Sequence, residues 1–542
     1  MSCILGRSHN SADYTPDEKS LGKSIEVGDS QVIWKEIVDG TELTVETKFT
    51  DIMAFQLSNT GDCDNADSLL TITYIQSRPD CKLVTAEVTF QGKKQETTTL
   101  HEKIKNKMAD VLSARPRKLL VFKNPYGGTG NALSIFSRVR PIFDIAGITC
   151  EEVVTTKAKD AEERIQKFNL SQYDGVVVVG GDGLLSEVVN GLTRYAQNKV
   201  GINYNDHTLQ HAPCSLPIGI IPAGTGNIYA KMFHGIREPT TAALHIIRGL
   251  RKASNLYSIH QDGKLCAYSI LVFGFGFPGD LIKSSQSKKY LGRSKYFFAV
   301  LDSILWKHDA YRMKLSFRQV FSPEQETTEK SETDMKTLEG EYHAIEGFSM
   351  NFKKTENSLL PNFGENFAKF VLVKKCSRLQ HLVFYDLLHS QKPNAYDLGY
   401  IDCVNAESCR IELLEPELLR RRNMYLNYDG ELLPITSSIV DIRLHNQIVS
   451  FYGVYFYLSI YLSIYLSIYL SLFISIYHCL HIYRNLFLSQ PDFTYVSLLI
   501  YLSIYLNFFS VCLSDFFYLS VRLNFFSSVC LSVSICFCLS AI

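Results

Sequence analysis

The chain has 542 residues, of which 55 are basic and 55 are acidic, and 46% of the residues are hydrophobic. This length allows several domains, and the balanced charge gives no overall field for nucleic acid, so a nucleic-acid partner is not expected. Fourteen cysteines are present. Those before residue 455 show no C-x-x-C pair and no zinc-type spacing with histidine, which is typical of reduced, cytosolic cysteines.

The N-terminal part of the chain divides into two segments. Residues 1–20 are polar and contain no secretory signal, so we expect a disordered start in the cytosol. Residues 21–113 show short β-type runs followed by a helical pattern, which predicts a β-rich module that ends in one helix. The predicted strands are 32–37, 43–49, 52–57, 69–75 and 83–90, and the predicted helix is 97–112.

Residues 114–256 alternate between strands and helices, and glycine-rich turns follow three of the apolar strands, at residues 124–131, 180–183 and 222–227. Glycine lets backbone N–H groups approach an anion, and the helix that follows presents further donors. The alternation predicts a doubly wound α/β lobe with the three turns at the carboxyl ends of its strands. The Walker A order is missing, as is a Gly-x-Gly-x-x-Gly fingerprint after the first strand, so these two nucleotide-binding motifs are excluded.

Asp182 stands in the middle of the second glycine turn. An aspartate there has no evident structural task. It is therefore predicted either to accept a proton from an attacking hydroxyl or to hold a magnesium ion beside a transferring phosphoryl group.

Residues 257–453 show mainly strand patterns and predict an antiparallel β-sandwich lobe, with the active site in the cleft between the two lobes. The expected strands are 267–273, 311–317, 342–352, 368–374, 408–414, 424–428 and 439–444. An acidic, polar insertion is expected at residues 321–341.

Residues 454–542 form a low-complexity tail in which Tyr-Leu-Ser-Ile repeats. Its hydrophobic run is long enough for a membrane helix, and residues 455–477 would form such an anchor. The DNA repeat TATC encodes this quartet in every frame, and TCTG encodes the Ser-Val-Cys-Leu found at 510–513 and 528–531. Translated repeat DNA therefore explains the tail better, and we expect it to be dispensable for catalysis.

The glycine turns and their neighbours resemble the lipid kinase superfamily of diacylglycerol and sphingosine kinases. The resemblance is carried by Asn124-Pro125 with Gly127-Gly128, Gly180–Gly183 with Glu187, Pro222–Asn227, and Asp429-Gly430-Glu431. Within this superfamily the chain is most similar to the ceramide kinase family, through residues 115–125, 241–247, 279–283, 291–292 and 375–378. The likeness covers residues 113–452. It also implies that the N-terminal module is a short version of a pleckstrin-homology-like domain.

The resemblance assigns roles to individual residues. Asp182 would be the general base, and Gly180, Gly181, Asp182, Gly183 and Asp280 would contact the lipid head group. The residues implied at ATP are Asn124, Pro125, Tyr126, Thr155, Thr156, Lys157, Ala158, Lys159, Glu187, Gly224, Thr225, Gly226, Lys289, Lys295, Asp429, Gly430 and Glu431. ATP and Mg²⁺ are the implied cofactors, with Ca²⁺ as an alternative ion, and no metal ligands are identified.

Two departures from the family pattern bear on these roles. Lys289 and Lys295 stand where family members often place arginine, and lysine keeps the charge without the bidentate fork. The insertion at 321–341 lacks the cysteine cluster that ceramide kinases commonly carry.

Together these features predict an ATP-dependent lipid kinase that phosphorylates the primary hydroxyl of ceramide, working from the cytosol as a peripheral protein at a membrane surface. Sphingosine is the alternative substrate, because the Gly224–Asn227 motif is intact, and diacylglycerol comes third. A soluble enzyme of the NAD kinase or phosphofructokinase type is a different candidate, because these enzymes share the Gly-Gly-Asp-Gly turn. An inactive membrane-binding scaffold is the third class.

Overall fold

The computed structural model describes residues 18–38, 41–59, 67–128, 130–288, 295–306, 308–320, 335–349, 365–389 and 393–454. The predicted repeat tail and its membrane anchor lie outside these residues, apart from Val454. Among the residues that the structure describes, no helix is both long and apolar enough to cross a membrane.

The N-terminal module is a six-stranded sheet with strand order β3-β2-β1-β6-β5-β4, followed by a helix. Its elements are β1 (Glu18–Val27), β2 (Gln31–Val38), β3 (Thr41–Lys48), β4 (Ile52–Asn59), β5 (Asp67–Ser77), β6 (Leu83–Lys93) and α1 (Lys94–Ala114). All five expected strands and the helix are present. The expectation of disorder through residue 20 is wrong for residues 18–20, because β1 begins at Glu18 and pairs there with β6. The pleckstrin-homology assignment stays a prediction.

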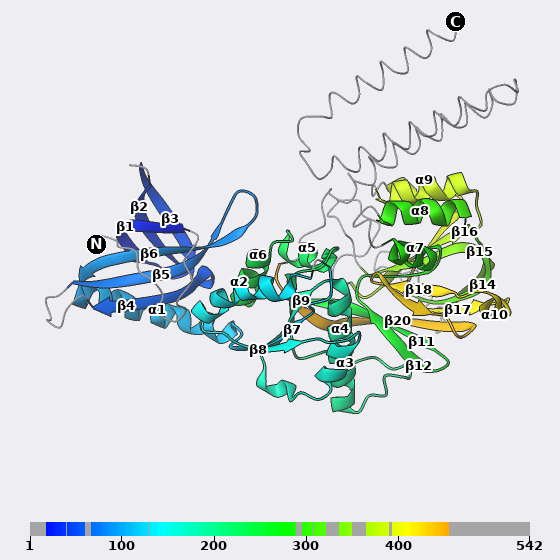
Figure 1. The fold of residues 1–542 in the computed structure, drawn as a ribbon, viewed down its shortest axis with the longest axis horizontal. Helices are drawn as coiled ribbons and strands as arrows, with labels where there is room; N and C mark the ends of the chain where they lie inside the picture. The colour runs from blue at the N-terminus through cyan, green and yellow to red at the C-terminus, as the bar shows by residue number, and fades with distance from the viewer. Residues whose placement is uncertain are drawn as a thin grey trace, which may run out of the picture. The chain divides into compact units, whose positions relative to one another are not determined.

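The α/β lobe has parallel strands in the order β10-β9-β7-β8 (Figure 1). Its elements are β7 (Lys118–Lys123), α2 (Ala132–Ile145), β8 (Thr149–Val154), α3 (Asp160–Ile165), β9 (Gly175–Gly180), α4 (Asp182–Val200), β10 (Ile218–Pro222), α5 (Ile228–His234) and α6 (Pro239–Arg248). Along β9, Val176 and Val178 pack in one core with α4, whereas Val177 and Val179 pack in another with α2 and α6. This alternation confirms the doubly wound prediction, since both faces of the sheet are buried.

The C-terminal lobe continues the same sheet. Its strands are β11 (Arg251–Gln261), β12 (Lys264–Ser269), β13 (Val272–Gly276), β14 (Tyr311–Gln319), β15 (Met335–Phe348), β16 (Ala368–Lys374), β17 (Ile401–Leu413), β18 (Tyr425–Tyr428), β19 (Glu431–Pro434) and β20 (Ile439–Tyr452). Its helices are α7 (Phe277–Ser287), α8 (Lys295–Trp306), α9 (Arg378–His389) and α10 (Leu418–Arg421). The strands β14, β15, β16 and β17 pair antiparallel in a closed ring.

Three sequence expectations for this lobe need correction. The lobe is not a separate sandwich, because β20 pairs with β17 and β11 in it and with β10 in the α/β lobe (Figure 1). The expected boundary after residue 256 falls inside β11. The expected insertion ends early, because residues 335–341 belong to β15 and pair with β14.

Glu346 gives the lobe a pH-dependent stability. This β15 residue is buried and accepts a hydrogen bond from the hydroxyl of Tyr385 in α9. Burial raises the pKa of Glu346 from 4.5 to about 7, although the Tyr385 hydroxyl opposes the rise. A raised carboxyl pKa means that the folded state holds the proton more tightly than the unfolded state. Stability is therefore fully present below pH 4.5 and falls as the pH rises to about 7.

We expect Glu346→Gln, which keeps the shape but not the charge, to remove this loss. The variant should match the wild type below pH 4.5 and exceed it above pH 7 by about 3 kcal/mol of unfolding free energy. Urea unfolding across this range measures the difference. Parallel pH curves for the two proteins would show that Glu346 does not titrate in this way.

Candidate active site

The three glycine turns meet at the carboxyl edge of the parallel strands. A Cβ atom on Gly224 would lie 2.4 Å from Cα of Gly181, and one on Gly128 would lie 2.7 Å from Cα of Gly224. Backbone therefore packs directly against backbone, and no side chain fits at these positions. Because such bare turns expose N–H groups, their meeting point is suited to an anion such as a phosphate.

Asparagine side chains form hydrogen bonds within the first and third glycine turns. The Asn124 Oδ1 accepts a hydrogen bond from the Tyr126 N–H at 2.9 Å across Pro125, and the Tyr126 side chain is 77% exposed. In the third turn the Asn227 side chain accepts from the Gly224 N–H at 2.9 Å and donates to the Gly224 carbonyl at 2.7 Å. In the sequence, Asn227 stands out only as the last residue of the Pro222–Asn227 motif. Its left-handed backbone, with φ of 51°, and its two hydrogen bonds show that it holds the turn closed.

Asp182 belongs to the second turn, is the first residue of α4 and contacts the helix that follows the third turn. Its Oδ1 accepts hydrogen bonds from the N–H groups of Ile228 at 3.0 Å and Tyr229 at 3.4 Å, so it caps the first turn of α5. The expectation that Asp182 has no structural task is therefore wrong. Its Oδ2 lies 2.7 Å from the position that a Cβ on Gly226 would take, which directs this oxygen at the third glycine turn.

The surroundings of Asp182 raise the pKa of its carboxyl group, which helps it to accept a proton. Burial raises the pKa of its carboxyl group above the ordinary value, and the nearby Asp429 carboxylate adds to the rise. The two backbone donors of α5 and the guanidinium group of Arg237 oppose the shift. Arg237, which also donates to the Asn227 carbonyl at 3.4 Å, was missed because no local motif marks it.

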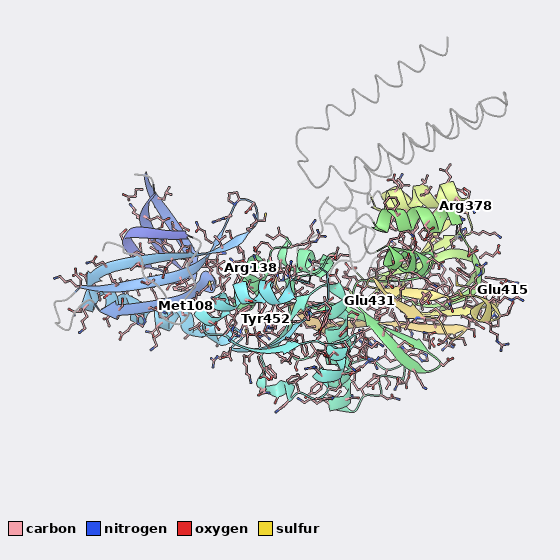
Figure 2. All side chains as sticks on the ribbon, viewed as in Figure 1. Met108, Arg138, Arg378, Glu415, Glu431 and Tyr452 are labelled. Atoms are coloured by element: carbon pink, nitrogen blue, oxygen red, sulfur yellow. The ribbon has the colours of Figure 1, made fainter. Side chains whose placement is uncertain are left out.

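The turn between β18 and β19 brings the far end of the chain to Asp182. The Asp429 carboxylate accepts hydrogen bonds from the N–H groups of Ile270, Leu271 and Val272 at 2.5, 2.9 and 3.1 Å. This residue thereby fixes the turn between β12 and β13. The Glu431 carboxylate lies 2.7 Å from the position that a Cβ on Gly183 would take, next to the start of α4 (Figure 2). Gly430, between these two acids, donates its N–H to Asn427.

Glu187 and the segment after β8 pack together at the start of α3. Glu187 lies one turn beyond Asp182 in α4, and it accepts from the Ala161 N–H at 3.3 Å. It therefore caps α3. Burial raises the pKa of the Glu187 carboxyl group, although the N–H groups of Lys159 and Ala161 oppose the rise.

The segment 155–159 makes mostly local contacts. The buried Thr155 is hydrogen-bonded to the Lys123 carbonyl at the end of β7, and Thr156 donates to Asp160. The Lys157 ammonium forms an exposed ion pair with Glu163 at 2.6 Å, and Ala158 is exposed. This segment follows β8 at the same sheet edge as the glycine turns, and the hydrogen bonds of Thr155 and Thr156 run to Lys123 and Asp160.

The remaining predicted residues lie elsewhere. Asp280 is in the first turn of α7, which follows β13, whereas Asp429 binds at the start of β13. The length of β13 therefore separates the backbone of Asp280 from that of Asp429, and the assignment of Asp280 to the substrate stays a prediction. Lys289 is outside the described residues, as is the side chain of Lys295, the first residue of α8.

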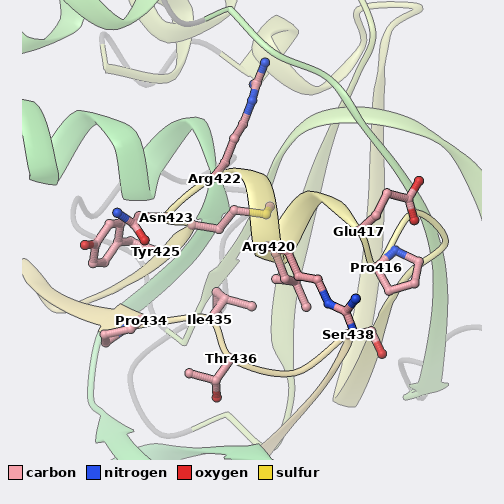
Figure 3. Close-up of a pocket in the computed structure, with 12 residues that line it drawn as sticks. Pro416, Glu417, Arg420, Arg422, Asn423, Tyr425, Pro434, Ile435, Thr436 and Ser438 are labelled. Atoms are coloured by element: carbon pink, nitrogen blue, oxygen red, sulfur yellow. The ribbon is translucent and has the colours of Figure 1, made fainter.

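A pocket of about 710 Å³ lies beside α10 and the start of β18 (Figure 3). It is lined by Pro416, Glu417, Leu419, Arg420, Arg422, Asn423, Met424, Tyr425, Pro434, Ile435, Thr436 and Ser438. Its lining shares no residue with the glycine turns. Tyr425 links it to α7, because the Tyr425 carbonyl faces Gly279.

Several known proteins are similar to this chain over the part that contains the glycine turns. The model of the diacylglycerol kinase catalytic domain matches residues 118–259. Human ceramide kinase is 30% identical over 425 residues, which cover 67% of this chain and 78% of that protein. Sphingosine kinase 1 from Arabidopsis thaliana is 35% identical over 203 residues, which cover 36% of this chain and 39% of that protein. A solved diacylglycerol kinase structure from Bacillus anthracis str. Sterne covers 62% of this chain and 97% of its own, with a TM-score of 0.40 and 17% identity.

The human relative matches at 30% identity over most of its own length, and the kinase catalytic model covers all three glycine turns. The chain belongs to the ceramide kinase family of lipid kinases.

Proposed function

We propose that this protein transfers the terminal phosphoryl group of ATP to the primary hydroxyl group of ceramide. The observation that supports this most is the meeting of three bare glycine turns beside the carboxylate of Asp182. A phosphate suits this meeting point because the glycine turns offer backbone N–H groups without side chains in the way. An alcohol next to Asp182 would have a proton acceptor. Family membership supplies the choice of lipid.

In this proposal Asp182, the glycine turns and Asn227 each have a separate role. Asp182 Oδ2 accepts the proton of the attacking hydroxyl, while the N–H groups of α5 hold Oδ1 and so fix the carboxylate in place. The turns at Gly128, Gly181 and Gly224 bind the phosphates through backbone donors. Asn227 keeps the third turn in shape. Positioning of this kind accounts for most of the catalysis of phosphoryl transfer, because the protein forms no bond to the phosphorus.

A divalent cation would suit the carboxylates at the first turn of α4. Asp429 and Glu431 bring carboxylates to the first turn of α4, and carboxylate oxygens are the ligands that Mg²⁺ prefers. When bound, Mg²⁺ neutralises charge on the phosphates. Ca²⁺ takes the same class of ligand.

Sphingosine is the second candidate substrate. The Gly224–Asn227 turn is intact, and a sphingosine kinase is among the relatives. The lipid itself lies at a membrane surface, so we also propose that the protein works there as a peripheral enzyme. Asp280, in the first turn of α7, is proposed to contact the lipid head group.

A labelled-ATP assay with ceramide, sphingosine and diacylglycerol in matched mixed micelles tests the substrate. We expect kcat/KM for ceramide to exceed that for sphingosine by roughly tenfold or more, which corresponds to ~1.4 kcal/mol of transition-state binding. A preference for sphingosine would select the alternative. Phosphorylation of NAD in the absence of lipid would contradict both, and no phosphorylation at all would favour the inactive scaffold.

A further inference from the structure

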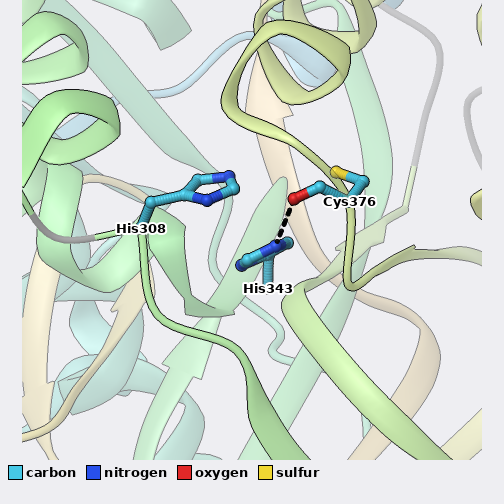
Figure 4. Close-up of side chains that lie close together, drawn as sticks. All are labelled: His308, His343 and Cys376. Carbon is cyan, nitrogen blue, oxygen red and sulfur yellow. Dashed lines mark hydrogen bonds between the residues drawn. The ribbon is translucent and has the colours of Figure 1, made fainter.

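Three metal-type ligands meet in the C-terminal lobe, away from the glycine turns. One ligand atom each from His308, His343 and Cys376 lies within 4.8 Å of the others (Figure 4). His308 precedes β14, His343 is in β15, and Cys376 lies between β16 and α9. The three residues are far apart in the sequence, so no spacing motif reveals them.

His343 has a carbonyl oxygen at each of its two ring nitrogens. Its Nδ1 lies 2.8 Å from the carbonyl oxygen of Asp309, and its Nε2 lies 3.1 Å from the carbonyl oxygen of Cys376 (Figure 4). A neutral imidazole has one N–H group, so it can donate to only one of these oxygens. The other nitrogen then directs its lone pair at an oxygen lone pair. A second ring proton removes the conflict, and so does a metal ion bound to that nitrogen once the carbonyl moves aside. An Nδ1–H bonded to a backbone carbonyl is common in metal-binding histidines.

His308 completes the cluster. Its ring is tilted against that of His343 with centroids 3.9 Å apart, and its Nε2 lies 3.0 Å from Nδ1 of His381 in α9. This contact occupies one ring nitrogen of His308 and leaves the other for a ligand. His381 is fully buried, and its Nε2 has no partner among the described residues.

Metal binding needs neutral imidazole nitrogens and a deprotonated sulfur. The Cys376 thiol would therefore release one proton as the sulfur–metal bond forms.

A second histidine pair in the chain shows that closely spaced rings alone do not indicate a metal. The ring centroids of His211 and His445 also lie 3.9 Å apart. In that pair the His445 Nε2 lies 2.8 Å from the hydroxyl of Ser258, a group that can donate or accept, so the contact needs no cation. Within the described residues, no thiol or carboxylate joins that pair as a third ligand.

We propose that His308, His343 and Cys376 bind a zinc-like divalent ion, with water or His381 as the fourth ligand. Two imidazole nitrogens and one thiolate suit Zn²⁺ better than Mg²⁺. Tetrahedral bonds of ~2.0–2.3 Å place ligand atoms roughly 3.5 Å apart, so atoms that lie within 4.8 Å of one another need to close by at most about 1.3 Å. The ion would join the end of α8, strand β15 and the start of α9, where Arg378 already donates to the Ile304 carbonyl.

Metal analysis of the full-length protein tests this site without an activity assay. After dialysis against buffered Zn²⁺, we expect one site that Cys376→Ser and His308→Gln each remove, so that bound zinc falls by one ion per chain. Co²⁺ in place of zinc should give a thiolate charge-transfer band that Cys376→Ser abolishes. Zinc should also raise the melting temperature of the wild type but not of the variants.

Two matched variants control for other ligands. Cys81→Ser removes an exposed thiol and His207→Asn a partly exposed histidine, and both should keep the ion. Circular dichroism of each variant checks folding, and the cobalt band of folded wild type does not depend on any variant. Equal zinc content in wild type and folded Cys376→Ser, or no thiolate band with Co²⁺, would overturn the proposal. The cluster would then be a hydrogen-bonded histidine stack only.

Discussion

Replacing Asp182 by asparagine is expected to lower kcat roughly 10²- to 10⁴-fold, the range that general-base removal typically costs. Asparagine retains an oxygen that can accept from the N–H groups of Ile228 and Tyr229, so α5 stays capped. The change therefore removes the proton acceptor with little effect on the fold. Steady-state kinetics with the preferred lipid measure kcat, and thermal melting checks the fold.

Asp174 provides a matched control for this substitution. Its carboxylate also accepts two backbone hydrogen bonds, from Arg117 at 2.7 Å and Lys118 at 2.9 Å, but at the opposite edge of the sheet. Asp174→Asn should leave kcat nearly unchanged. Equal turnover in wild type and Asp182→Asn would show that Asp182 is a helix cap and not a base.

The second large effect is expected for Gly224→Ala. The new Cβ atom would lie 2.4 Å from Cα of Gly181, and because this neighbour is backbone, no side-chain rotation relieves the clash. The second and third turns must separate, and a displacement of about 1 Å in such a site can cost about 100-fold in rate. We expect kcat/KM for ATP to fall by about that factor, measured at saturating lipid.

Gly399→Ala is the control for Gly224→Ala, because a Cβ atom at Gly399 meets no atom within 4 Å. Its kinetics should match the wild type. If Gly224→Ala folds and keeps the wild-type kcat/KM for ATP, the close packing of the turns has no part in nucleotide binding.

The glycine turns could be predicted because their signals are local. Each is an apolar strand, a glycine cluster and a helical pattern in succession, and parallel strands bring their carboxyl ends to one edge. Asp182 lies in such a turn, so its place could be foreseen. Its bond to α5 could not, because the partner N–H groups lie 46 residues away in the chain.

Long-range contacts explain the expectations that were wrong. One strand was expected over residues 267–273, yet it breaks at Ile270 and Leu271, whose N–H groups bind Asp429. Asp429-Gly430 looks like an ordinary turn in the sequence, and only the fold shows what its carboxylate holds. The continuation of one sheet through β20 depends on pairing with β10, more than 200 residues earlier. No local pattern encodes such a pairing.

The most direct test of the account is a crystal structure of the protein with a non-hydrolysable ATP analogue and Mg²⁺. We expect the phosphates to lie against the turns at Gly128, Gly181 and Gly224, with the Asp182 carboxylate facing the side from which the lipid hydroxyl enters. A nucleotide bound elsewhere, or an Asp182 carboxylate turned away from its terminal phosphate, would contradict the proposed chemistry.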